Sequence, residues 1–184
     1  SLGTLEFAAH QVIMNIQTLS MMNGQVFAVS ATTLMGQSLG KRRLDMAQAY
    51  TSRCQRSGML VAIFLGLVFL LFGKPLSSLY TNDLACIDIC LSILWIVALI
   101  QPFQSSQFIV SGALRGAGDT KFVAKLTFFT VMLLRPGLAI LAVNGFHLGL
   151  PGAWFAITID QILRAVVILA RYYSGKWKFL KRYV

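Results

Sequence analysis

Three charged residues, Arg135, Asp160 and Arg164, lie deep within apolar stretches near the carboxyl end of the chain. Asp160 and Arg164 are four positions apart, which places them on one face of a helix and within reach of an ion pair. At about 1.5 Å per helical residue, Arg135 reaches the same depth as Asp160 if the two helices are antiparallel neighbours. An unpaired charge at the centre of a bilayer costs at least about 2.5 kcal/mol. The sequence therefore predicts one ion-pair network of these three side chains.

Two roles are open for this network. A proton carrier must release and regain its proton near the working pH, whereas flanking arginines favour the ionised carboxylate of Asp160. This argument favours a structural network, and a direct role in ion coupling or substrate binding is the alternative.

Uncharged polar residues form two further groups within the apolar stretches. One follows steps of three or four residues near the start of the chain, and the other lies beside Pro102. Such stripes avoid lipid and face other helices or water. They predict either hydrogen bonds between helices or the wall of a translocation cavity. The candidate cavity-lining residues are Asn15, Thr18, Gln25, Gln101 and Gln104.

The stretches that carry these residues have the length of membrane helices. The chain of 184 residues is 57% hydrophobic and 12% charged, whereas a soluble domain has about 25% charged residues. A run of about 20 apolar residues spans a bilayer as a helix. We therefore expect an all-α fold, a polytopic membrane helix bundle in which residues 1–184 form a single transmembrane bundle. The five predicted helices cover about residues 5–39, 46–72, 84–114, 121–143 and 153–173.

Basic residues sort to one side of this bundle. The chain has 16 Lys and Arg against 6 Asp and Glu, a formal charge of +10. With five crossings, the first connection, the third connection and the tail lie on one side of the membrane. The other connections lie on the opposite side, and Lys74 is their only Lys or Arg residue. The shared side holds Lys41, Arg42, Arg43, Arg115, Lys121, Lys176, Lys178, Lys181 and Arg182. Because positive residues favour the cytoplasmic side, we expect a cytoplasmic C-terminus and no nucleic-acid partner.

The segment GALRGAGDTK, residues 112–121, connects the third and fourth predicted helices. Its glycines permit a tight turn, and Asp119 or Thr120 is a suitable N-cap for the next helix. It lacks the spacing of a phosphate-binding loop. No cluster of His, Cys and acidic residues indicates a metal site or an enzyme, so we expect no metal, no cofactor and no catalytic activity.

Several segments resemble the carboxy-terminal half of multidrug and toxic compound extrusion (MATE) transporters. They are AAHQVIMNIQTL, TTLMGQSLG, GALRGAGDT, GLPGAWFAITIDQILRAVV and YYSGKWK. The resemblance implies five transmembrane helices corresponding to helices 8–12 of a twelve-helix, two-lobe transporter. It implies a secondary active transporter that exports drugs and toxins, as cationic or amphipathic organic compounds, by cation antiport with alternating access. The implied partners are small organic cations, membrane lipids and an amino-terminal lobe of the same polypeptide, so we expect the chain to be an incomplete carboxy-terminal lobe. The implied location is the bacterial inner membrane.

One departure from the family pattern bears on the coupling ion. The sodium-coupled branch is expected to carry an acidic residue where this chain reads QPFQ, with neutral Gln101 and Gln104. The coupling ion, proton or sodium, stays open, and its main site is expected in the amino-terminal half. The alternatives are a lipid-linked oligosaccharide flippase of the same wider superfamily and a non-transport membrane scaffold. A flippase would need a more cationic cavity, in which Asp160 would offset one of the two arginines.

Overall fold

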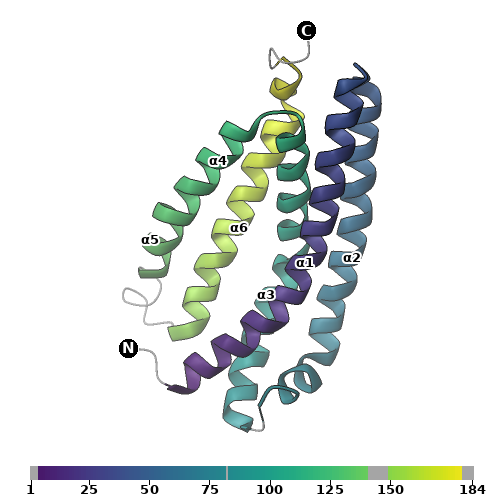
Figure 1. Cartoon of the computed structure of the whole chain (residues 1–184). Helices are drawn as coiled ribbons and strands as arrows, with labels where there is room; N and C mark the ends of the chain where they lie inside the picture. Colours follow the sequence, from purple (N-terminus) through teal and green to yellow (C-terminus); the bar gives the residue numbers. More distant parts are fainter. Residues whose placement is uncertain (1–3, 82, 141–148, 180–184) are drawn as a thin grey trace.

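A computed structural model describes residues 4–81, 83–140 and 149–179, and these residues form helices joined by short turns, with no strand among them (Figure 1). The all-α fold is therefore confirmed. The elements are α1 (Thr4–Gly40), α2 (Leu44–Ser78), α3 (Leu84–Gly116), α4 (Thr120–Phe129), the π-helical turn η1 (Thr130–Leu134), α5 (Arg135–Ile140), α6 (Gly149–Tyr173) and the 3₁₀ turn η3 (Lys176–Phe179). Helix α3 packs on α1, α2 and α6, and α4 and α5 lie on the other side of α6 (Figure 1).

The helix ends follow local signals. The side chain of Asp83 caps α3 by accepting a hydrogen bond from the Ala85 amide at 3.0 Å, which satisfies one of the free amides of the first turn. Helix α2 continues to Ser78, beyond the predicted end at residue 72, but it bends where Phe72 has φ −112° and ψ 18°. Pro75, three residues later, cannot donate a backbone hydrogen bond to the preceding turn. The proline thus bends the helix rather than ending it.

The fourth predicted helix is divided by a π turn. Helix α4 widens at Thr130–Leu134 before α5 begins at Arg135, whose amide donates to the Thr130 carbonyl. This turn stands directly before Pro136, whose missing N–H leaves a carbonyl of the preceding turn without its donor. Residues 141–143 of the predicted helix lie outside the described residues.

The buried apolar residues form two clusters at opposite ends of the bundle. The first packs Met35, Leu114, Ile168 and Trp177, among others, around the ends of α1, α3 and α6. The second contains Ile13, Ile93 and Trp154 at the other end. The middle of the bundle lies between the two clusters.

The basic connections lie together at one end of the bundle. The α1–α2 turn, the α3–α4 turn and η3 all occupy this end (Figure 1), as the sequence predicted. Lys181 and Arg182 lie outside the described residues. The Asp119 carboxylate accepts a hydrogen bond from Arg171 Nε at 2.7 Å, which ties the α3–α4 turn to the last turn of α6. Asp119 is the N-cap residue of α4, but its side chain makes no capping bond.

Helices α2 and α3 each contain an 18-residue window with a mean hydropathy of 2.3, long and apolar enough to cross a membrane. The outward side of α2 exposes Leu60, Phe64, Leu67 and Leu71. In a bilayer this surface is suited to lipid, whose tails are as apolar as leucine.

Helices α1 and α3 approach closely through small residues. A Cβ atom built on Gly112 would lie 2.4 Å from the Ala28 carbonyl oxygen, and one on Gly116 would lie 2.3 Å from the Thr32 carbonyl oxygen. The Thr32 hydroxyl lies 2.8 Å from the Gly112 carbonyl oxygen and 2.8 Å from the Ala28 carbonyl oxygen of its own helix, and shares its one hydrogen between them. Glycines spaced by four are the pattern that lets membrane helices pack backbone to backbone. The first part of GALRGAGDTK is therefore a helix-crossing surface, and the turn begins only after Gly116.

Candidate functional site

Buried polar side chains occupy the middle of the bundle, between the two apolar clusters. We call this group the polar centre; it comprises Gln17, Ser20, Gln101, Gln104, Ser105, Ser106, Gln107, Thr130, Asp160, Gln161 and Arg164. They come from α1, α3, the π turn and α6, each near the middle of its helical segment. Bulk water does not reach polar groups at this depth, so these side chains must form hydrogen bonds with one another or with bound molecules.

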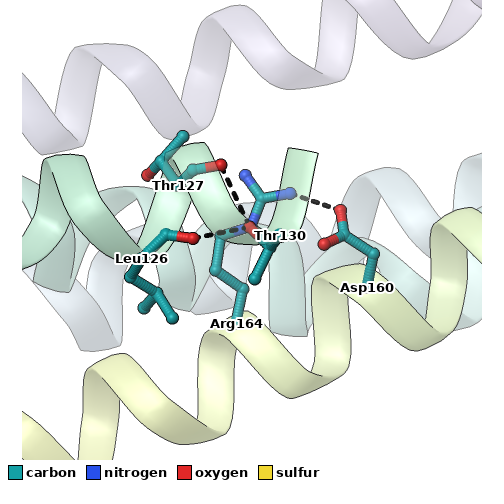
Figure 2. A network of polar contacts seen from close by, with 5 residues as sticks. All are labelled: Leu126, Thr127, Thr130, Asp160 and Arg164. Carbon is teal, nitrogen blue, oxygen red and sulfur yellow. Dashed lines mark hydrogen bonds and ion pairs between the residues drawn. The ribbon is translucent and has the colours of Figure 1, made fainter. Parts of the chain in front are cut away.

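An ion pair between Asp160 and Arg164 holds the charge of the polar centre (Figure 2). Asp160 is fully buried, and 7% of the surface of Arg164 is exposed. In Figure 2 the guanidinium of Arg164 extends from α6 towards the segment that carries Thr127 and Thr130. Within the part of the chain that the structure describes, one carboxylate oxygen, Oδ1 of Asp160, and Nε of Arg164 have no hydrogen-bond partner. The pair is thus neutral as a unit, but it retains capacity for further hydrogen bonds.

The π turn beside this pair has its own polar contacts. The Thr130 hydroxyl lies 3.0 Å from the Leu126 carbonyl oxygen and 3.3 Å from the Thr127 carbonyl oxygen, as Figure 2 shows. A side chain that bonds to a carbonyl one turn earlier helps to satisfy a backbone that has left the regular α-helical pattern. Thr130 therefore supports the wide turn next to Arg164.

Arg135 does not join the ion pair. It is half-buried at the first position of α5, and no carboxylate among the described residues pairs with it. The ring of His10 on α1 packs on Trp154, with centroids 5.6 Å apart. The expected three-residue network is therefore reduced to Asp160 and Arg164. The prediction used only depth along the helices, whereas the π turn at Thr130–Leu134 also changes the direction in which every later side chain points.

Gln101 and Gln104 are buried inside the bundle, where they line a small cavity between α1, α2 and α3. The Ser20 hydroxyl donates to the Oε1 atom of Gln101, and the Ser105 hydroxyl donates to the Gly58 carbonyl oxygen at 3.2 Å. The volume is about 10 Å³, which is too small for an organic compound. Within the described residues the two glutamines therefore lie inside the bundle, and a part in a substrate cavity stays a prediction.

Asn15, Thr18 and Gln25 occupy a different surface. All three are exposed on the side of α1 that turns away from the other helices. The Thr18 hydroxyl donates to the Met14 carbonyl oxygen of its own helix at 2.7 Å. Gln25 lines a shallow hollow of about 500 Å³ together with Met22, Val26, Val29 and Ser30. The two groups of candidate cavity residues therefore do not face a common space within the described residues.

The sequence interpretation missed the inward side of α1. The residues that face α3 are small and spaced by four, namely Ser20, Gly24, Ala28 and Thr32. This spacing is a recognised signal for close helix packing and was available in the sequence. The ion pair of Asp119 with Arg171 was also missed, although both residues stand at the predicted cytoplasmic end.

The sequence model of the family described as MatE matches residues 1–141. A protein of Thermotoga maritima named "Probable multidrug resistance protein NorM" is 31% identical over 176 residues, which cover 96% of this chain and 38% of that protein. A protein of the same name from Neisseria meningitidis serogroup A is 32% identical over 165 residues, 88% of this chain and 35% of that protein.

Solved structures share the fold. The crystal structure of the eukaryotic MATE transporter AtDTX14 superposes with a TM-score of 0.88 at 21% identity, over 95% of this chain and 39% of that one. An outward-facing multidrug resistance MATE family transporter of the MOP superfamily gives a TM-score of 0.84 at 19% identity, over 94% and 39% of the two chains.

The chain spans less than two fifths of the length of these two curated relatives. The helix order, the polar centre and the family match over most of the chain agree with one another. The chain belongs to the MatE family of integral membrane transporters.

Proposed function

We propose that the chain forms the carboxy-terminal lobe of a secondary active transporter that exports cationic or amphipathic organic compounds. Export would be coupled to antiport of protons or sodium ions, with two lobes that open a shared passage to one side of the membrane at a time. The relatives named as multidrug resistance proteins support this class of function. The observation that carries the proposal is the presence of exposed amide and hydroxyl side chains on the outward face of α1.

The outward face of α1 carries polar side chains among apolar ones such as Leu19 and Val26. Asn15, Thr18 and Gln25 are exposed on α1, whereas the outward side of α2 presents leucine and phenylalanine. Amide side chains at membrane depth avoid lipid and face protein or water-filled space. We therefore infer that the outward face of α1 borders the passage between the two lobes.

The orientation follows from the basic end of the bundle. We propose that the α1–α2 turn, the α3–α4 turn and η3 lie on the cytoplasmic side of the bacterial inner membrane, in agreement with the positive-inside rule. Fused to the C-terminus of the full-length protein, a reporter enzyme that works in the cytoplasm should be active, and one that works only after export should be inactive. Activity of a reporter that requires export would reverse the orientation.

Transport is tested with the full-length protein in cells that lack their own efflux pumps. Expression should lower the accumulation of a fluorescent organic cation, and an ionophore that collapses the ion gradients should restore it. Unchanged accumulation across a varied set of dyes would contradict export, and efflux that survives the ionophore would point to another energy source.

Variants connect the transport to the α1 face. Asn15→Leu and Gln25→Leu should reduce dye efflux at equal membrane expression, because each removes a hydrogen-bonding group from the proposed passage. Gln37→Leu is the matched control, since Gln37 is exposed on the same helix but near its basic end. Equal efflux by all three variants would contradict the assignment of Asn15 and Gln25 to the border of the passage.

A further inference from the structure

A small cavity lies where the midpoints of α1, α2 and α3 meet. It is lined by Ser20 and Gly24 of α1, Ala62 of α2, and Gln101, Gln104 and Ser105 of α3, among others. Its volume is about 10 Å³, near the lower limit of space that one water molecule requires. The cavity therefore has room for one very small ligand.

Three polar atoms at this cavity have no hydrogen-bond partner among the described residues. They are Nε2 of Gln101 and both Nε2 and Oε1 of Gln104. Each of the two side chains is only 2% exposed, so neither can reach bulk solvent. Buried amide groups are costly to leave unpaired, and the arrangement offers two donors and one acceptor.

The lining also decides the charge of the ligand. No Asp or Glu lines the cavity, so a cation would be buried without a compensating charge, which is strongly unfavourable. Two amide N–H₂ groups are available there, and such donors oppose a cation. A water molecule can accept from the amides and donate to Gln104 Oε1, and buried waters typically make about three hydrogen bonds.

We propose that this cavity is a hydration site, which binds one ordered water molecule between Gln101 and Gln104. The water satisfies both amides and links α3 to the Ser20 side of α1 through the bond between Ser20 and Gln101. The Gln101 and Gln104 part of the polar centre is thereby satisfied by solvent rather than by an ion. This site is separate from the outward face of α1 and does not depend on the proposed transport function.

Hydroxyl-radical footprinting with X-rays tests the site in the full-length protein, because radicals formed from an ordered water oxidise the side chains that touch it. Met21 lines the cavity, and the fully buried Met35 on the same helix belongs to the apolar cluster at the basic end. Met21 is half-buried and is therefore also reached by radicals from bulk solvent, so the test is the change in its oxidation rate between variants, with Met35 as the internal reference. Gln104→Leu removes two of the three free polar atoms, and Ala62→Val fills the space while keeping both glutamines. Either variant should lower the Met21 rate several-fold and leave the Met35 rate unchanged.

Three results would overturn the proposal. The first is a Met21 rate that neither variant changes, provided that at least one variant keeps the thermal stability of the parent. The second is saturable protection of Met21 when sodium chloride replaces choline chloride, which would assign a cation to the cavity. The third is a density map of the full-length protein that resolves ordered water elsewhere but shows no peak between Gln101 Nε2 and Gln104. Loss of dye transport would not bear on the hydration site, so the two proposals fail separately.

Discussion

The crossing of α1 and α3 should fail on addition of one methyl group. In Gly112→Ala the new Cβ would lie 2.4 Å from the oxygen, 2.9 Å from the carbon and 3.0 Å from the Cα atom of the Ala28 peptide. An ordinary contact begins at 3.4 Å, so the helices must separate by about 1 Å at this point. All three atoms belong to the backbone, which means that no rotamer change can relieve the contact.

The cost can be worked from two terms. Overpacking of a close-packed interior typically costs about 1–3 kcal/mol. Separation by about 1 Å also carries the Thr32 hydroxyl, now 2.8 Å from the Gly112 carbonyl oxygen, beyond hydrogen-bond range. A hydrogen bond between membrane helices contributes about 0.6 kcal/mol on average. We expect Gly112→Ala to lower the free energy of unfolding by about 2–4 kcal/mol.

The assay is reversible unfolding of the full-length protein in mixed micelles. Gly137→Ala is the matched control, because a Cβ on Gly137 of α5 would meet nothing within 4 Å. The double variant Ala28→Gly with Gly112→Ala should be as unstable as Gly112→Ala alone, since the clash involves only the Ala28 backbone. Rescue by Ala28→Gly, or equal stability of Gly112→Ala and Gly137→Ala, would refute the reasoning.

Three further variants probe the other contacts in the same unfolding assay. Thr32→Val should cost about 0.6 kcal/mol by removing the bond to Gly112, whereas Thr33→Val, whose hydroxyl bonds only within its own exposed helix turn, should cost less; equal effects would argue against an interhelical role for Thr32. Asp160→Asn should lower the free energy of unfolding by about 3–5 kcal/mol because it leaves Arg164 charged and buried. The double variant Asp160→Asn with Arg164→Met should recover most of this loss. A shifted pH optimum of transport with normal folded yield would instead assign Asp160 a direct role in coupling. Asp119→Asn should lower the free energy of unfolding by about 1 kcal/mol by releasing the partly exposed Arg171. Asp45→Asn loses only the exposed pair with Arg43 and should have a smaller effect. The reverse order would show that the pair of Asp119 with Arg171 does not stabilise the contact between the α3–α4 turn and α6.

The elements that follow from short-range signals were predictable from the sequence. The end of α1 near Gly40 and the start of α3 at Leu84 agree with the predicted limits, because a glycine and a capping aspartate mark them locally. The grouping of the basic connections at one end could also be predicted, because it depends only on the number of membrane crossings. The π turn before Arg135 did not follow, because the period of a regular helix gives no sign of one wider turn.

The faces of α1 show why the site was predicted only in part. Polarity identified Asn15 and Gln25 as unusual in a membrane helix, but it did not say which side of the helix packs on α3. That choice is made by size, since Gly24 and Ala28 allow an approach that Asn15 and Gln25 would prevent. Glutamines on α3 meet the small side of α1 and become buried, whereas the amides on α1 stay outside. Side-chain volume therefore decides the orientation, and polarity then decides what the outward face can bind.

The ion pair of α6 and the crossing of α1 with α3 act at different stages of folding. Asp160 and Arg164 belong to one helix, so their pairing neutralises α6 before it meets any neighbour and lowers the cost of placing two charges in a bilayer. The crossing of Gly112 with Ala28 joins two helices and contributes only once both are inserted and packed. Loss of the ion pair should therefore reduce the amount of inserted protein, whereas loss of the crossing should leave insertion normal and lower the unfolding free energy of what is inserted. Measuring membrane-inserted yield and unfolding separately on Asp160→Asn and Gly112→Ala would distinguish these stages, and the same pattern for both variants would contradict this division of roles.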